Sequence, residues 1–292
     1  RILFPTTVAE ALEIMARESG YRVLAGGTDL VVAIKEGKEA PRTLISLSKV
    51  AALKGITAAN GELRIGAATT LAAVEENDAI RSRYTALAEG AGQVGSWQVR
   101  NIATVGGNLC SAVPSADTAP PLLAAGASVK LVSLKGERVV SLADFFLGPM
   151  ETVLQPGELL AEINLPPVPA GVGSCYLKIG PRDAMDIALV GVAAQVIMED
   201  GVCRGAGLAL GAVAPTPLKV TEAEKILTGS SLTAADIARA AAIAADAARP
   251  ISDHRASADY RRKMVAVLTR RALQEAWARA LSGQKGGERA CS

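Results

Sequence analysis

Apolar and polar positions along the first 170 residues follow two periods, one typical of strands and one typical of helices. Short apolar runs predict strands over residues 21–25, 43–47, 63–65, 129–133 and 159–165. Apolar residues at helical spacing predict helices over residues 30–35, 71–77, 84–94 and 116–125. A further helix is predicted to begin at a capping box, Thr7-x-x-Glu10, and to stop before Gly20. This part of the chain therefore mixes helices with strands.

A stretch rich in proline and glycine, residues 166–173, is the predicted boundary between two domains. Beyond it, alternating apolar runs predict strands over residues 174–178, 188–198 and 207–213. The last third is predicted to be helical, with one helix opened by Thr233-x-x-Asp236 and a second over residues 257–281. Helices and strands in mixed order, followed by helices gathered at the end, predict an α+β protein of two domains.

Composition narrows the classes of function that remain. The chain has 292 residues, of which 50% are hydrophobic and 3% aromatic, and its net charge is +2. Nucleic acid is not an expected partner, because its recognition needs basic patches and stacking rings that this composition does not supply. No apolar stretch is long enough to predict a membrane span.

The four cysteines, at positions 110, 175, 203 and 291, are far apart in the sequence. Without a Cys-x-x-Cys pair, the sequence predicts neither a zinc site nor an iron–sulfur cluster in this chain. Scattered thiols suit a reducing compartment, and the first residues lack the apolar core of a signal peptide. The expected location is therefore cytoplasmic.

Two glycine pairs stand at the ends of apolar runs, and each is followed by a short polar residue. The first lies in Val23–Asp29 and the second in Ile102–Asn108. Glycine tolerates positive φ, and successive amides in such a turn form a concavity that suits phosphate oxygens. Two such loops could hold one pyrophosphate from both sides, which predicts a dinucleotide ligand. The alternative for either pair alone is an ordinary tight turn between strands.

Other motifs give weaker signals. Gly90-x-Gly92-x-x-Gly95 has the spacing of a Rossmann fingerprint, but the residues before it are helical in character where the fingerprint needs a strand. The only histidine, His254, is interpreted as an ordinary loop residue, because no serine or cysteine stands in a nucleophile-elbow context. Asp117, taken alone, is a candidate helix N-cap.

The two glycine segments are part of a longer ordered set of motifs. The set consists of Ala25-Gly-Gly-Thr-Asp-Leu30, Thr104-Val-Gly-Gly-Asn-Leu109, Ser111-Ala-Val-Pro-Ser-Ala-Asp117, Phe145-Phe146-x-Gly148, Pro156-Gly-Glu-Leu-Leu160, Tyr176-Leu-Lys178 and Ser257-Ala-x-Tyr260-Arg-Arg262. Together these motifs resemble the FAD-binding (medium) subunit of the molybdenum hydroxylase family, which includes enzymes of the carbon monoxide dehydrogenase and xanthine dehydrogenase type. The resemblance runs almost from end to end of the chain.

The resemblance implies a fold and a division into domains. The expected fold is an FAD-binding domain of the vanillyl-alcohol-oxidase (PCMH) type in two α/β subdomains, followed by a smaller C-terminal α/β domain of the carbon monoxide dehydrogenase flavoprotein type. The implied FAD-binding domain spans residues 1–170, with subdomains of about 1–54 and 55–170. The C-terminal domain is expected over residues 171–284, and residues 285–292 are expected to form a flexible tail.

The resemblance also implies the site. Matching positions that line the FAD site are Val23, Leu24, Ala25, Gly26, Gly27, Thr28, Asp29, Leu30, Thr104, Val105, Gly106, Gly107, Asn108, Asp117, Leu160 and Lys178. Both glycine segments are expected to contact the FAD diphosphate, and Asp117 can accept a hydrogen bond from a ribityl or ribose hydroxyl. Lys178, a surface charge if taken alone, can offer positive charge to a reduced, anionic flavin. The FAD is expected to be non-covalent, and neither catalytic residues nor metal ligands are implied in this chain.

In enzymes of this family the work is divided among subunits. A large subunit with a molybdopterin cofactor oxidises the substrate, and a small subunit with two 2Fe–2S clusters passes the electrons on. The flavin of the medium subunit then delivers them to an external acceptor. The resemblance therefore implies an oxidoreductase subunit with iron–sulfur and molybdenum partners, in a dimer of heterotrimers. Two other functions stay open: a free-standing FAD-dependent oxidoreductase and a non-enzymatic nucleotide-binding module.

Overall fold

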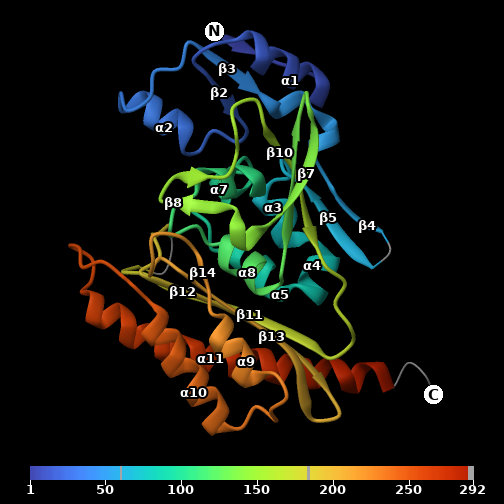
Figure 1. Cartoon of the computed structure of the whole chain (residues 1–292), viewed down its shortest axis with the longest axis vertical. Coiled ribbons are helices and arrows are strands. Elements are labelled where there is room, and N and C mark those ends of the chain that lie inside the picture. The colour runs from blue at the N-terminus through green and yellow to red at the C-terminus, as the bar shows by residue number, and fades with distance from the viewer. Residues whose placement is uncertain (60, 183–184, 289–292) are drawn as a thin grey trace.

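The computed structural model describes residues 1–59, 61–182 and 185–288, which form three tiers along the long axis of the molecule (Figure 1). The N-terminal tier, blue in Figure 1, is a small sheet flanked by helices. The middle tier holds a five-stranded sheet and short helices, and the C-terminal tier, yellow to red, holds a four-stranded sheet covered by longer helices.

The N-terminal tier is a parallel sheet in the order β1-β3-β2. Its elements are β1 (Ile2–Leu3), α1 (Val8–Arg17), β2 (Tyr21–Leu24), α2 (Leu30–Lys35), β3 (Thr43–Ser46) and the 3-10 helices η1 (Leu47–Lys49) and η2 (Ala51–Leu53). Helix α1 buries Ala11, Leu12 and Met15, which share one core with Ile45 of β3. These apolar residues recur at helical spacing, so one face of the helix covers the sheet.

The middle tier is built on an antiparallel sheet in the order β4-β5-β10-β6-β7. Its strands are β4 (Ile56–Ala59), β5 (Glu62–Gly66), β6 (Ser128–Ser133), β7 (Gly136–Ser141), β10 (Leu159–Leu165) and a separate hairpin of β8 (Phe146–Gly148) and β9 (Glu151–Thr152). Its helices are α3 (Leu71–Glu76), α4 (Asp78–Arg83), α5 (Thr85–Gly92), α6 (Trp97–Arg100), α7 (Val105–Ser111), α8 (Ala119–Ala124) and the 3-10 helix η3 (Leu142–Asp144). Leu131 and Ile163 at the centre of this sheet are fully buried in the largest core of the chain.

The C-terminal tier is an antiparallel sheet in the order β11-β12-β13-β14. Its elements are β11 (Val172–Ile179), β12 (Val190–Glu199), β13 (Val202–Gly211), β14 (Leu218–Lys219), α9 (Thr221–Leu227), α10 (Ala234–Ala247) and α11 (Ala258–Glu288). Successive residues of a strand face opposite sides of a sheet. Tyr176 and Ala193 accordingly join the core of the middle tier, whereas Cys175 and Val192 join the core beneath α9, α10 and α11.

Most of the predicted elements are present. The strands predicted at residues 129–133 and 159–165 are β6 and β10, and the three predicted beyond the boundary are β11, β12 and β13. The capping box of Thr233 and Asp236 is complete. In α1 the box is half formed, because the Glu10 carboxylate accepts from Thr6 rather than from Thr7.

The structure also differs from the predictions. Strands β1, β4, β7, β8 and β9 were not predicted. Strand β7 is an edge strand whose residues are exposed or half-buried and carry no long apolar run. The last helix was predicted to end at residue 281, but it continues to Glu288. The first part of the expected tail, residues 285–288, is therefore helical, and its remainder, residues 289–292, lies outside the described residues.

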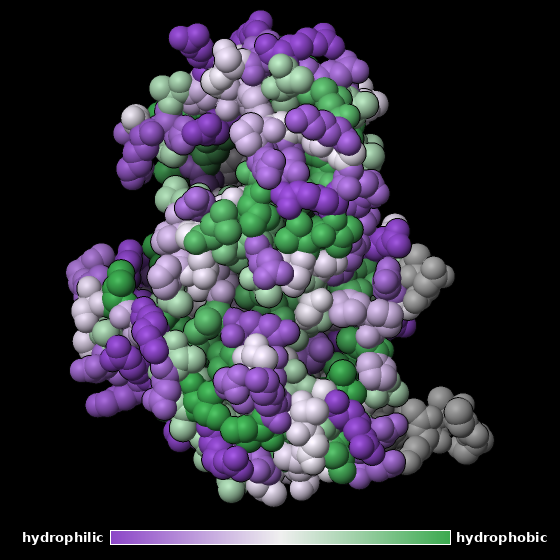
Figure 2. Space-filling model, in the orientation of Figure 1, coloured by the Kyte–Doolittle hydropathy of each residue, from purple (hydrophilic) through white to green (hydrophobic). Residues whose placement is uncertain are grey.

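Exposed apolar side chains gather on one side of the middle tier, in the region of β7 and the β8–β9 hairpin (Figure 2). Val139 of β7 is 63% exposed, and Leu147 and Met150 of the hairpin are 61% and 78% exposed. A gathered apolar surface of this kind is typical of a face that contacts another molecule. Within the described ranges, no helix combines the length and apolar character of a bilayer-spanning segment.

Candidate functional site

The two glycine segments, far apart in the sequence, are neighbours in the structure. A Cβ atom on Gly26 would lie 2.1 Å from the carbonyl oxygen of Ile102 and 2.8 Å from Cα of Ala103. A Cβ atom on Gly107 would lie 3.8 Å from Cβ of Ala25. The N-terminal tier therefore meets the middle tier here through backbone without side chains. We call residues 25–29 and 104–108 the glycine junction.

The first segment of the junction is a turn with open hydrogen-bonding groups. Gly27 has a φ of +74°, a left-handed conformation that favours glycine, and it turns the chain from β2 toward α2. Within the described chain, Ala25, Gly26 and Thr28 form no hydrogen bond, and all three are partly exposed. Backbone groups in such a position are satisfied by solvent or by a ligand.

The second segment differs from the predicted loop. Residues 105–108 form the first turn of α7, and neither Gly106 nor Gly107 has a positive φ. Each amide from Val105 to Asn108 already donates within the protein. The acceptors, in order, are the carbonyl of Thr69 at 3.0 Å, that of Ala67 at 2.9 Å, the Thr104 hydroxyl at 3.1 Å and the Thr104 carbonyl at 2.9 Å. The prediction of a second amide concavity was therefore wrong.

The glycines of the second segment have a packing role instead. A Cβ atom on Gly106 would lie 2.6 Å from both Cβ and the carbonyl oxygen of Ala67. Gly106 therefore lets α7 lie directly against the chain that leaves β5. A side-chain bond also joins the two segments' helices, because the hydroxyl of Ser111 at the end of α7 donates to the carboxylate of Asp29 at 2.7 Å.

Asp117 and Lys178, from the middle and C-terminal tiers, form a buried ion pair. The Lys178 ammonium lies 2.7 Å from Asp117 Oδ2 and donates to the Gln93 carbonyl at 3.1 Å. The Tyr176 hydroxyl donates to Asp117 Oδ1 at 2.7 Å. We call Asp117, Tyr176 and Lys178 the Asp117 cluster. The N-cap of α8 is Thr118, so the interpretation of Asp117 as a helix cap was wrong.

Burial sets the electrostatics of this cluster. The side chains of Lys178 and Asp117 are 8% and 7% exposed, and Tyr176 is 2% exposed. Burial raises the pKa of the Asp117 carboxyl, while the Lys178 charge and the hydrogen bonds from Lys178 and Tyr176 oppose that rise. Burial and the neighbouring Asp117 charge raise the pKa of the Tyr176 hydroxyl well above its ordinary range.

The cluster is connected to the glycine junction. The hydroxyl of Thr118 donates to Asn108 Oδ1 at 2.5 Å, which ties the residue after Asp117 to α7. Val105 and Leu160, also predicted site residues, are 0% and 3% exposed and lie in the core of the middle tier. Their side chains pack in that core rather than face solvent.

The sequence did not single out Tyr176 or Thr118 as functional residues. Tyr176 stands two positions before Lys178 in a strand, and side chains two apart share a face of the sheet. This two-residue spacing in a strand is the sequence signal that could have identified Tyr176 as a neighbour of Lys178. The bond of Thr118 to Asn108 depends on how α7 and α8 pack together, and no local pattern indicates it.

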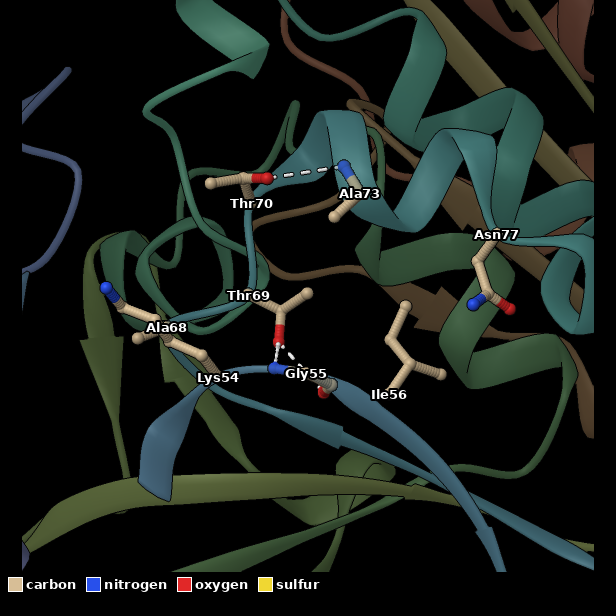
Figure 3. Close-up of a pocket in the computed structure, with 8 residues that line it drawn as sticks. All are labelled: Lys54, Gly55, Ile56, Ala68, Thr69, Thr70, Ala73 and Asn77. Carbon is tan, nitrogen blue, oxygen red and sulfur yellow. Dashed lines mark hydrogen bonds between the residues drawn. The ribbon is translucent and has the colours of Figure 1, made fainter. Parts of the chain in front are cut away.

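A cavity of about 400 Å³ shares no lining residue with the glycine junction or the Asp117 cluster (Figure 3). Its lining residues are Lys54, Gly55, Ile56, Ala68, Thr69, Thr70, Ala73 and Asn77, and none of them is a predicted site residue. The Thr69 hydroxyl bonds to the backbone of Gly55, and the Thr70 hydroxyl caps α3 at the amide of Ala73. Because these polar groups serve the fold, the cavity offers little to orient a ligand.

The weaker motifs do not build a competing site. Gly90 and Gly92 lie inside α5, which follows α4 rather than a strand, so the Rossmann geometry is absent from this described segment. His254 is exposed in the segment before α11. Among the described residues, no three histidine, cysteine or acidic side chains gather where they could hold a metal ion.

Two family models match the chain in succession. Residues 1–168 match a model described as the FAD binding domain in molybdopterin dehydrogenase. Residues 175–276 match one described as the CO dehydrogenase flavoprotein C-terminal domain. The first match includes the glycine junction and Asp117, and the second includes Tyr176 and Lys178.

Individual proteins are similar over nearly the same length. The chain is 34% identical over 276 residues to the xanthine dehydrogenase FAD-binding subunit of Escherichia coli, with 94% of both chains covered. It is 34% identical over 277 residues to the carbon monoxide dehydrogenase medium chain of Afipia carboxidovorans, with 94% of this chain and 96% of that one covered. A chain in a solved structure of carbon monoxide dehydrogenase from Hydrogenophaga pseudoflava superposes with a TM-score of 0.92 at 32% identity, covering 96% and 97%.

Proposed function

This chain belongs to the family of FAD-binding subunits of molybdenum hydroxylases, and we propose that it carries electrons from a partner's iron–sulfur clusters through FAD to an external acceptor. Family membership makes it the flavoprotein subunit of an oxidoreductase, with FAD as its cofactor. The expected fold, an FAD-binding domain followed by a smaller C-terminal domain, is confirmed. The observation that carries the proposal is the glycine junction with its open donors.

The residues of the junction fit a dinucleotide. At Ala25, Gly26 and Thr28, amide and hydroxyl donors without a protein partner are partly exposed, and such groups suit phosphate oxygens. The second segment has no free amide between residues 105 and 108. We propose that the first segment binds the diphosphate through hydrogen bonds, while Gly107, partly exposed beside Ala25, keeps a side chain out of its way and Gly106 lets α7 pack closely against Ala67.

The other predicted residues complete the proposed site. Val23, Leu24 and Leu30 flank the first segment, Thr104 caps α7, and Val105 and Leu160 are buried in the core of the middle tier. Asp29 accepts from Ser111, and Asn108 accepts from Thr118. We propose Asp117 and Lys178 as the polar end of the site. Bound FAD supplies the ability to exchange electrons, and these residues bind it, orient it and fix the charge beside it.

Partners are proposed from the division of labour in the family. The sequence has no Cys-x-x-Cys pair, and no three cysteine, histidine or acidic side chains gather among the described residues, so we place the proposed clusters in a separate iron–sulfur (small) subunit. Substrate oxidation belongs to a molybdenum (large) subunit in the same proposal. The apolar surface over β7 and the β8–β9 hairpin supports contact with another subunit. A dimer of heterotrimers is the proposed assembly.

Domain limits and compartment are also proposals. We propose an FAD-binding domain of residues 1–170 and a C-terminal domain of residues 171–284, since the two family matches end at 168 and begin at 175. The separate sheets of the first two tiers support subdomains that meet near residue 54. We propose the cytoplasm as the compartment, because the described cysteines are free and scattered.

Purification of the native complex tests the proposal. We expect about one FAD per chain, with iron and molybdenum present in the complex but absent from the separated chain. Stopped-flow absorbance should then show the flavin being reduced only when the partner subunits and an oxidisable substrate are present.

Two results would contradict the proposal in different ways. A separated chain that reduces its own flavin with an organic substrate would favour the free-standing oxidoreductase. A colourless chain that takes up no added FAD would favour a nucleotide-binding module without redox chemistry.

A further inference from the structure

We propose that Asp117 and Tyr176 are positioning residues for Lys178, which they neutralise and hold so that the flavin meets a hydrogen-bond donor within a neutral ion pair. The sequence led us to expect a free positive charge on Lys178 beside the flavin. In this proposal the charge of Lys178 is compensated by Asp117. This inference rests on the proposed FAD site and deepens it, because it specifies how the site sets the flavin's tendency to accept electrons.

The first observation that supports this proposal is the environment of Lys178. Its ammonium group has three N–H donors, of which Asp117 Oδ2 takes one at 2.7 Å and the Gln93 carbonyl a second at 3.1 Å. Only 8% of the Lys178 side chain is exposed, and an uncompensated charge is costly at that depth. Lys178 is therefore held as half of an ion pair, with one N–H left for a ligand.

The second observation is the hydrogen bond and the packing of Tyr176. Its hydroxyl donates to the other oxygen of Asp117, so both carboxylate oxygens are engaged. On β12, Gly191 pairs with Lys178, and a Cβ atom there would lie 2.5 Å from the Tyr176 hydroxyl oxygen. The missing side chain at Gly191 leaves the space that the phenol occupies. The bond from Tyr176 to Asp117 is thus part of how the two strands pack.

The backbone of Asp117 is also fixed. Its carbonyl oxygen lies 2.5 Å from where a Cβ atom would stand on Gly90 of α5. The next residue, Thr118, donates to Asn108 of the glycine junction. Carboxylate, phenol and ammonium therefore have one arrangement, and that arrangement is tied to the segments proposed to hold the diphosphate.

The compensated pair has a chemical consequence. Reduction adds negative charge to a flavin, so a free positive charge nearby makes reduction more favourable, whereas a neutral pair does so far less. Asp117→Asn keeps the shape of the side chain but removes its charge, which leaves Lys178 uncompensated. We expect this variant to increase the equilibrium constant for flavin reduction by about tenfold or more.

The experiment uses the full chain loaded with FAD and equilibrated with a reference dye during gradual reduction at pH 7. The matched control is Glu224→Gln. Glu224 is also a buried carboxylate, with Lys219 at 3.7 Å and the Leu208 amide at 2.9 Å, but it lies on α9, beneath the opposite face of the C-terminal sheet. We expect the control to leave the reduction equilibrium unchanged. Tyr176→Phe removes one hydrogen bond to Asp117 but leaves the charge of the carboxylate, so it should retain FAD and shift the equilibrium by a smaller factor than Asp117→Asn.

The outcomes separate this inference from the proposed function. If the unaltered chain binds FAD and Asp117→Asn leaves the reduction equilibrium constant unchanged or lowers it, the inference is overturned and the proposed function stands. If Asp117→Asn loses FAD, Lys178→Gln decides: loss of the ammonium charge leaves the Asp117 carboxylate uncompensated and should lower the constant, and an unchanged constant overturns the inference. An unaltered chain that binds no FAD overturns both.

Discussion

Substitution of Gly26 by alanine tests the contact on which the candidate site depends. The added methyl group would lie 2.1 Å from the carbonyl oxygen of Ile102 and 2.8 Å from Cα of Ala103. Both neighbours are backbone atoms, and the Ala103 carbonyl is already bound by the Leu71 amide at 2.9 Å. Neither can turn aside as a flexible side chain would, so the N-terminal and middle tiers must separate locally.

The size of the effect follows from the overlap. Non-bonded heavy atoms prefer separations of about 3.5 Å or more, so the chain must move by more than about 1 Å at this point. Overpacking of this kind costs about 1 to 3 kcal/mol, and the absence of a yielding side chain places Gly26→Ala at about 3 kcal/mol. A shift of that size between the two segments should also weaken FAD binding by at least about tenfold.

Urea unfolding of the FAD-free chain measures the first effect, and calorimetric titration with FAD measures the second. Gly205→Ala is the matched control, because its methyl group would meet the side chain of Ile197, whose flexible Cδ1 is the nearest atom at 3.3 Å. We expect the control to change both quantities little. If Gly26→Ala were as stable as the unaltered chain, the contact between the segments would be refuted. If it were destabilised but bound FAD normally, the placement of the cofactor at the junction would be refuted.

Three further predictions use different measurements. Thr28→Val should weaken FAD binding about tenfold without changing the unfolding free energy, because its hydroxyl has no protein partner in the described chain; a matching loss of stability would count against a ligand role. The pKa of Asp253 is held well below its usual range, chiefly by the hydrogen bond from the Arg255 amide and further by those from the Ala256 amide and the Arg261 guanidinium, although burial opposes the shift. This carboxylate therefore stabilises the fold above its unfolded pKa of about 3.9 and ceases to do so as the pH falls. Asp253→Asn should therefore be less stable than the unaltered chain at pH 7 in thermal unfolding, with a difference that shrinks below about pH 4; a pH-independent difference would contradict the assignment. The separated chain should show no dehydrogenase activity toward aldehydes, purines or N-heterocycles in a dye-reduction assay, and turnover would reject the proposed division of labour.

Local pattern accounts for much of the fold. Strands β6 and β10 and the capped helix α10 have apolar runs or capping residues that specify them without help from distant residues. Strand β7 was missed because it lies at a sheet edge, where no second neighbour requires an apolar run. The length of α11 was underestimated because its final residues are polar and glycine-containing, and helical period no longer marks them.

In the candidate site, too, some features follow from local sequence and others depend on tertiary contacts. The first glycine segment behaves as its residues predict, because the positive φ of Gly27 is a local property of the turn. The second was misjudged, since two of its amides donate to carbonyls of Thr69 and Ala67, which precede it by more than 30 residues, and the other two donate to Thr104 at the start of α7. Sequence alone also placed Asp117 in a local cap, although its partners come from another sheet.

The amino-acid sequence by itself determined where strands and helices alternate, which family the motifs resemble, and which segments are candidates for the cofactor site. These features depend on residue type and short-range period, which a linear chain displays directly. Only the tertiary structure decided which donors remain open and which charges cancel. Whether an amide of α7 or the ammonium of Lys178 is free depends on what packs against it, and that is set by contacts between tiers far apart in the chain.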